Sequence, residues 1–237
     1  EVDASESMLR SVTEREPANP TATLALAGTL MRADRYDEAA VTLDTYIKGI
    51  AQLERRHWSI LYRRAIAYDN LKRWPEAEAD FLKALELFPN QPQVLNYLGY
   101  TWVDMGINLD RGLEMLNTAV DLRPNTGYIV DSLGWAHYRL ENYEDAVQHL
   151  EEAVLLTPND ATIIDHLGDA YWQVGRKLEA RYKWSQALDA EPDDTLRTTI
   201  EEKLKDGLTI NLLKKAELED ASAVEGATKA TGNTSAN

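Results

Sequence analysis

The sequence contains no cysteine among its 237 residues. This absence excludes disulfide bonds and thiolate metal sites, and it is compatible with either a reducing or an oxidising compartment. Long apolar runs are missing too, because no stretch approaches the roughly 20 apolar residues that a membrane-spanning helix needs. We therefore expect no transmembrane segment in this chain.

Positive charge is also scarce. The 25 Lys and Arg residues stand against 40 Asp and Glu, which gives a formal net charge of −15. Residues 91–175 hold thirteen acidic and three basic residues, whereas residues 51–90 hold six acidic and seven basic ones. A chain this acidic repels phosphate backbones, so we expect no nucleic-acid partner. The acidity either serves solubility alone or attracts a basic partner.

The common signatures of catalysis are absent as well. The sequence has no Gly-x-Ser-x-Gly elbow, no phosphate-binding Gly-rich loop and no His-Glu-x-x-His pair. Its four histidines, at positions 57, 137, 149 and 166, lack the spacing of metal ligands, and a zinc site needs three or four convergent ligands. Asp165 and Asp169 lie one helical turn apart, but such pairs are frequent in acidic helices. We predict no enzyme activity, no cofactor and no metal.

What the sequence does contain is one tetrapeptide motif in four copies. The copies read Leu-Phe-Pro-Asn, Leu-Arg-Pro-Asn, Leu-Thr-Pro-Asn and Ala-Glu-Pro-Asp, with prolines at 89, 124, 158 and 192, spaced 35, 34 and 34 residues apart. Because proline cannot continue a helix and the pair that it forms with Asn or Asp favours a turn, each copy marks the end of a helical segment. A period of about 34 residues with helix-length segments between the stops is typical of a solenoid of two-helix repeats.

The segment before each proline repeats a pattern of small and large residues. Before Pro192 the pattern residues are Leu167, Gly168, Tyr171, Ala180, Trp184 and Ala187. Their spacing resembles that of the tetratricopeptide repeat, and this resemblance implies an all-α, right-handed α-solenoid, a superhelix of helix-turn-helix repeats with a C-terminal capping helix. The small residues are expected where two helices cross, because a longer side chain forces the axes apart. We therefore expect Gly168 to tolerate leucine poorly and its neighbour Asp169 to tolerate it well.

On this pattern the chain divides into consecutive helical repeats. The five predicted repeats are residues 20–57, 58–91, 92–126, 127–160 and 161–192. The first is long, and we place its extra residues in its second helix or in the connection around residues 49–57. Residues 1–19 look like the second helix of a truncated preceding repeat, residues 193–216 like an amphipathic capping helix, and residues 217–237 like a disordered polar tail.

In tetratricopeptide repeats the first helix of each pair lines the concave surface, so the resemblance also implies a binding groove. Projecting the first helices in this phase makes the groove aromatic and acidic, and we expect it to bind a protein or peptide with a basic and apolar surface. The predicted groove residues are Tyr62, Asp69, Asn96, Tyr100, Asp104, Tyr128, Asp131, Trp135, Tyr138, Arg139, Asp165, Asp169 and Trp172. In the alternative interpretation, Trp135 and Trp172 pack between helices as ordinary core residues.

Three runs extend the resemblance. Residues 131–140, 166–172 and 180–184 look like the C-terminal repeats of bacterial envelope proteins of this family, which include outer-membrane lipoproteins that act as adaptors for a periplasmic C-terminal processing protease. This similarity implies an exported scaffold in the periplasm or at the periplasmic face of the outer membrane, with a cytoplasmic location as the alternative. The predicted function is a non-catalytic scaffold or adaptor that holds a partner.

Two other functions stay open at this stage. One is a structural module that forms a homo-oligomer, with its groove filled by its own tail or by a second copy. The other is a small-ligand pocket lined by Trp135, Tyr138 and Trp172. A tight dimer with an occupied groove would distinguish self-assembly from the adaptor, which is expected to expose its groove.

Overall fold

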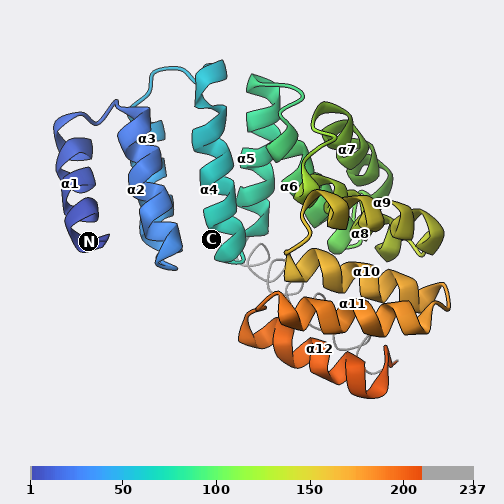
Figure 1. The fold of residues 1–237 in the computed structure, drawn as a ribbon. Helices are drawn as coiled ribbons and strands as arrows, with labels where there is room; N and C mark the ends of the chain where they lie inside the picture. Colours follow the sequence, from blue (N-terminus) through green and yellow to red (C-terminus); the bar gives the residue numbers. More distant parts are fainter. Residues whose placement is uncertain (1, 210–237) are drawn as a thin grey trace, which may run out of the picture. The chain divides into compact units, whose positions relative to one another are not determined.

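The computed structural model describes residues 2–209, and every regular element in this part of the chain is a helix (Figure 1). The chain forms two compact units, of which the first runs to Val94 and the second begins at Leu95. The first unit contains α1 (Val2–Arg15), α2 (Pro20–Arg32), α3 (Tyr36–Lys48), the short 3-10 helix η1 (Arg55–His57), α4 (Trp58–Asn70) and α5 (Trp74–Leu87). The predicted all-α class is confirmed.

The second unit begins within α6 (Pro92–Asp104), the helix that crosses the boundary between the units. Its helices are α7 (Leu109–Leu122), α8 (Gly127–Arg139), α9 (Tyr143–Leu156), α10 (Ala161–Gln173), α11 (Lys177–Asp189) and α12 (Asp194–Asp206). The most extensive contacts join α8 to α9 and α10 to α11, and each pair is two consecutive helices joined by a short turn. The helices therefore pack as pairs of sequence neighbours, as the 34-residue period predicts.

Prolines and capping side chains determine where several helices begin. α2 starts at Pro20, whose fixed φ and missing N–H suit the first helical position. The side chain of Asn19 accepts hydrogen bonds from the backbone N–H groups of Thr21 and Ala22. Asp160 caps α10 in the same way. These signals lie within a few residues of each helix start, so they can be read from the sequence.

Glycines let the two helices of a pair approach closely. A β-carbon on Gly168 of α10 would lie 2.5 Å from the ring of Trp184 in α11, and one on Gly134 of α8 would lie 2.7 Å from Leu150 in α9. Such distances leave no room for a side chain, which confirms that these two glycines lie at helix crossings. Gly28 of α2 differs, because a β-carbon there would meet only Arg32, at 3.7 Å.

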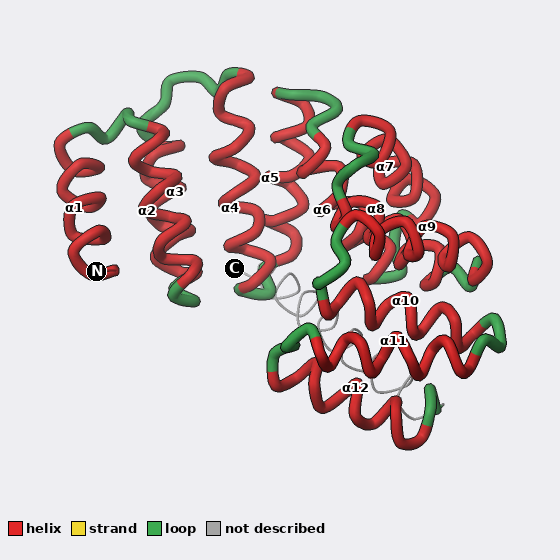
Figure 2. Tube along the Cα trace, in the orientation of Figure 1, coloured by secondary structure: helices red, strands yellow, loops and turns green. Residues whose placement is uncertain are grey.

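The connection between α3 and α4 is long, and Figure 2 shows it as an extended green segment. It holds the extra residues of the first predicted repeat, since α3 has ordinary length and ends at Lys48. Nδ1 of His57 accepts a hydrogen bond from the backbone N–H of Glu54 at 2.8 Å, and the Glu54 side chain caps the backbone N–H of His57 in return. His57 is buried with its ring against Tyr46.

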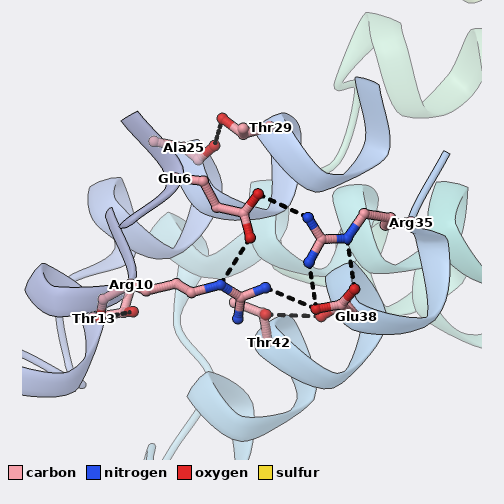
Figure 3. Close-up of polar contacts among 8 residues, drawn as sticks. All are labelled: Glu6, Arg10, Thr13, Ala25, Thr29, Arg35, Glu38 and Thr42. Carbon is pink, nitrogen blue, oxygen red and sulfur yellow. Dashed lines mark hydrogen bonds and ion pairs between the residues drawn. The ribbon is translucent and has the colours of Figure 1, made fainter. Parts of the chain in front are cut away.

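A charged cluster joins α1 to the start of α3 (Figure 3). The carboxylate of Glu6 accepts hydrogen bonds from Arg10 at 2.9 Å and from Arg35 at 2.8 Å. The carboxylate of Glu38 accepts from the same two arginines, with the Arg35 Nε contact at 2.6 Å. The side chains keep between 14% and 46% of their surface exposed, so this cluster lies at the surface of the first unit.

α12 packs against α11 at the end of the described chain. Ile200 is fully buried, and Arg181 of α11 donates a hydrogen bond to the backbone carbonyl of Leu204. The helix ends at Asp206, where Gly207 takes a φ of 75°, so it stops before the predicted end of the capping helix at residue 216. Residues 210–237, including the predicted tail, lie outside the described residues. Within residues 2–209, no helix has both the length and the apolar character needed to cross a membrane.

Candidate functional site

In the second unit, side chains of successive first helices meet one repeat apart. The helices concerned are α6 from Leu95 onward, α8 and α10, and α12 occupies the next equivalent position. Three contacts are separated by 35 residues each: Arg139 Nη1 to Asp104 Oδ1 at 2.7 Å, His166 Nδ1 to Asp131 Oδ1 at 2.9 Å, and Gln173 Nε2 to the Tyr138 hydroxyl at 3.2 Å. We call the surface formed by these residues of α8 and α10, with Tyr128, Trp135, Asp165, Asp169 and Trp172, the first-helix face.

A further inter-repeat contact is buried and involves a side chain of α12. Nζ of Lys203 donates hydrogen bonds to Oδ2 of Asp165 at 2.7 Å and to Oδ2 of Asp169 at 2.8 Å. The three side chains are at most 7% exposed. The other oxygen of Asp169 accepts a hydrogen bond from the indole Nε1 of Trp184 at 2.9 Å. Asp169 therefore uses both carboxylate oxygens inside the protein.

Burial and neighbouring charges act in opposite directions on each pKa in this cluster. For Asp169, Lys203 and His166 the net change is upward. Burial raises the pKa of Asp169 to about 6, although the ammonium of Lys203 opposes the rise. Burial lowers the pKa of Lys203, but the two carboxylates outweigh it and the net change is upward. For His166, burial likewise lowers the pKa and Asp131 raises it, with a net rise above the ordinary value. The cationic forms of Lys203 and His166 are thus held by carboxylates of the preceding repeat.

Aromatic rings cover much of the same face. The Trp135 ring stacks on His166, with centroids 4.0 Å apart, and on Tyr138, with centroids 4.6 Å apart. Trp172 packs against Trp184 at 5.3 Å. This direct stacking leaves no room for a ligand between the Trp135 and Tyr138 rings, and the small-ligand pocket lined by Trp135, Tyr138 and Trp172 stays a prediction. Both tryptophans also pack against the core cluster of this unit while staying partly exposed.

The thirteen predicted groove residues differ widely in exposure. Tyr128 is the one exposed residue among them, at 50%. Five are buried, namely Asn96, Asp131, Tyr138, Asp165 and Asp169. The others are partly exposed, namely Tyr62, Asp69, Tyr100, Asp104, Trp135, Arg139 and Trp172. Tyr62 and Asp69 belong to the first unit and the rest to the second.

Two expectations from the sequence need correction. Four of the five predicted groove aspartates, namely Asp104, Asp131, Asp165 and Asp169, were expected to attract a basic partner, but each contacts a basic side chain of the same chain. Asp169 was expected to face the groove and to tolerate leucine. That expectation is wrong, because Asp169 is 5% exposed and hydrogen-bonded to both Lys203 and Trp184.

Sequence reasoning missed Lys203 although a signal for it exists. Lys203 follows Asp169 by 34 residues and Asp165 by 38, close to the separation of the other inter-repeat contacts. Searching for a basic residue one period after each aspartate of a first helix would have found it. Within residues 2–209, no group of three or more His, Asp or Glu side chains is arranged to hold a metal ion.

Comparison with known proteins agrees with this architecture. Models described as tetratricopeptide repeat match residues 1–52 and 58–91, and one described as TPR repeat matches residues 134–175. Among solved structures, the fold resembles a chain of the APC/C hetero-tetramer Cut9-Hcn1, with a TM-score of 0.75 and 17% identity over 88% of this chain. This chain spans only 40% of the length of that one.

Two smaller proteins are matched over most of their length. A tetratricopeptide repeat protein from Parabacteroides merdae has a TM-score of 0.69 and 16% identity, over 98% of this chain and 88% of that one. YrrB, described as a TPR protein with an unusual peptide-binding site, has a TM-score of 0.56 and 18% identity, over 82% of this chain and 97% of that one. At such identities these likenesses concern the fold alone.

Proposed function

Because the chain belongs to the tetratricopeptide repeat family, we propose that it is a non-catalytic scaffold that holds a protein partner on the first-helix face of its second unit. The observation that carries this proposal is the set of accessible aromatic side chains on that face, with Tyr128 half exposed and Trp135 and Trp172 partly exposed. Aromatic residues dominate the energy of protein interfaces, and soluble proteins seldom present several on one face without a binding role.

The ion pairs within this face limit which side chains of a partner it can bind. Asp165 and Asp169 are buried against Lys203, so they offer no free carboxylate to a basic side chain. Short-range binding therefore comes from apolar and aromatic contacts with an apolar patch on the partner. The acidic excess of residues 91–175 acts at longer range and favours a partner with basic residues around that patch.

The finer form of the proposal is an adaptor in the bacterial envelope. It rests on the resemblance of residues 131–140, 166–172 and 180–184 to envelope repeat proteins that serve a periplasmic C-terminal processing protease. In that role the chain works in the periplasm or at the periplasmic face of the outer membrane. Fractionation of the source cells tests the location separately from binding, because a purely cytoplasmic protein would remove the envelope role and leave the scaffold role intact.

A second candidate function is self-association through α9 and α11, the second helices of two repeats, which we call the outer helices. Leu178 and Tyr182 lie one turn apart on α11 and are 82% and 69% exposed, and Leu155 on α9 is 82% exposed. Exposed apolar side chains at this spacing form a helix stripe that a second copy can cover. Light scattering after size exclusion measures this directly, and the Tyr182→Ser variant is expected to shift a dimer toward monomer.

Two exposed tyrosines give a matched test of the two functions. Tyr128→Ser alters the first-helix face and Tyr182→Ser alters the outer face, and neither removes a buried side chain. The purified protein and both variants are used to capture partners from the source organism's extract, with mass spectrometry as readout. The proposal expects Tyr128→Ser to lose a partner that Tyr182→Ser retains. Retention by Tyr128→Ser together with loss by Tyr182→Ser would place binding on the outer helices and contradict the proposal.

A further inference from the structure

The first unit contains a cavity of about 250 Å³ that is lined only by residues of that unit. The long connection between α3 and α4 forms one wall, and the turn between α1 and α2 forms another. Its main lining residues are Pro17, Pro20, Tyr46, Ile50, Arg56 and His57. Tyr46 and His57 are themselves only 6% and 2% exposed, so this part of the cavity wall is formed by side chains that are packed inside the protein.

The polar groups that line this cavity without a partner are hydrogen-bond donors. Because Nδ1 of His57 accepts from the backbone N–H of Glu54, the neutral ring carries its hydrogen on Nε2. Within residues 2–209, neither that Nε2 nor the hydroxyl of Tyr46 has a hydrogen-bond partner. Burial raises the pKa of Tyr46, which keeps its hydroxyl protonated and able to donate. A ligand must therefore bring an acceptor.

The positive charge of Arg56 favours an anionic acceptor over a neutral one. The guanidinium of Arg56 lines the cavity, and its ion pair with Glu54 is weak because the two side chains are 71% and 58% exposed. The segment 48–57 holds three basic residues and one acidic residue, in a chain whose net charge is −15. A carboxylate would accept from Arg56 in a charge-assisted contact. This stretch is thus one place on an acidic protein where a small anion is not repelled.

Size and lining limit the rest of the ligand. Pro17, Pro20 and Ile50 give the cavity an apolar lining. Its volume lies below the roughly 300–1,000 Å³ of usual drug-sized pockets, so it accommodates a single ring or a branched alkyl group.

We propose that this cavity binds a small apolar carboxylate, with the carboxylate on Arg56, Tyr46 and His57 and the apolar group against Ile50 and the two prolines. The aromatic and branched-chain acids are the ligand class that fits. The same chemistry is offered by a free acid or by the last residue of a peptide. This site is independent of the partner-binding face, so it stands or falls separately from the proposed scaffold role.

The test measures binding of phenylacetate to the whole chain by calorimetry and by ligand-observed NMR. Phenylacetamide has the same shape without the charge and is expected to bind about tenfold more weakly, because it loses the charge-assisted contact. Arg56→Gln is expected to cost a similar factor. Arg55→Gln is the matched control, since Arg55 is the exposed neighbour whose guanidinium lies over Phe88 and does not line the cavity.

Further measurements separate the alternatives. Ile50→Trp fills the cavity and is expected to abolish binding of phenylacetate without changing the helical circular dichroism. A tetrapeptide ending in phenylalanine compares the two sources: binding about tenfold tighter than phenylacetate assigns a peptide terminus, and equal or weaker binding assigns a free acid. The proposal is overturned if neither acid binds the wild type, if the amide binds equally well, or if Arg55→Gln loses binding as much as Arg56→Gln.

Discussion

One charged cluster of each unit shows how much the burial of an ionic contact matters. In the first unit, Glu6 and Glu38 share Arg10 and Arg35 in a cluster at the surface (Figure 3). In the second unit, Lys203 and its carboxylates are almost fully buried. Both clusters contain several short hydrogen bonds. Water can replace the contacts of the exposed cluster at little cost in free energy, but it cannot solvate the buried charges around Lys203. The comparison teaches that burial, and not the number of bonds, decides what a charged cluster contributes to stability.

Loss of Lys203 should break this contrast most strongly. Lys203→Met leaves two carboxylates buried without their cation and should lower the free energy of unfolding by about 3–5 kcal/mol, as removal of one partner from a buried ion pair does. Urea unfolding measures it. A triple variant, Lys203→Met with Asp165→Asn and Asp169→Asn, removes both charges and should lose less than the single variant. Near-wild-type stability of Lys203→Met would mean that α12 does not dock as described.

Gly168→Leu should have the next largest effect. The new side chain would meet the Trp184 ring at the crossing of α10 and α11, and overpacking of this kind costs about 1–3 kcal/mol. Asp169→Leu, one residue along, should also destabilise, because it leaves the indole N–H of Trp184 without its acceptor. Thermal unfolding compares the two. A wild-type melting temperature for Asp169→Leu would restore the open-groove interpretation of the sequence.

A smaller, pH-dependent effect is expected at His137. Burial, together with the neighbouring His149 ring, lowers the pKa of His137 below its ordinary value of 6.5. The folded state therefore favours the neutral ring, and the stability that this contributes is present above pH 6.5 and is lost as the pH falls through the lowered value. His137→Phe removes the titration, so the melting temperature of the variant should rise relative to that of the wild type as the pH falls from about 7 to about 5. A difference that stays constant with pH would refute this assignment.

The surface cluster should give the smallest change. Arg35→Gln removes contacts to Glu6 and Glu38, both of which remain solvated, so the melting temperature should fall slightly at low salt and not at all at high salt. Arg35 holds the pKa of Glu38 down to about 2, with Arg10 assisting. The carboxyl of Glu38 should therefore titrate nearer its ordinary pKa in the variant, which NMR can follow. A loss as large as that of Lys203→Met would erase the contrast between the two clusters.

Several features could be predicted from the sequence because their causes are local. Prolines and capping residues mark helix ends within a few positions. Gly134 and Gly168 each mark the point where the two helices of one repeat cross. The periodic pattern assigned Asp165 and Asp169 to an open groove. It could not tell an open groove from a covered one, because the residues that cover Asp165 and Asp169 come from α12, a full repeat later.

The same distance effect explains the aromatic side chains. Trp135 was expected either in the groove or in the core, and the structure places it between the two, stacked on His166 of the next repeat and still partly exposed. The path of residues 49–57 was also beyond prediction. It depends on the reciprocal cap of Glu54 and His57 and on the contact with Tyr46, which no helical period encodes.

Hydrogen–deuterium exchange of the protein with its captured partner tests the central claim most directly. The account predicts that binding slows exchange in peptides from α8 and α10, around Tyr128, Trp135 and Trp172, while peptides confined to α9 and α11 change little. Slowed exchange confined to α9 and α11, around Leu155, Leu178 and Tyr182, would show that the partner binds the outer helices, and it would contradict the assignment of the first-helix face.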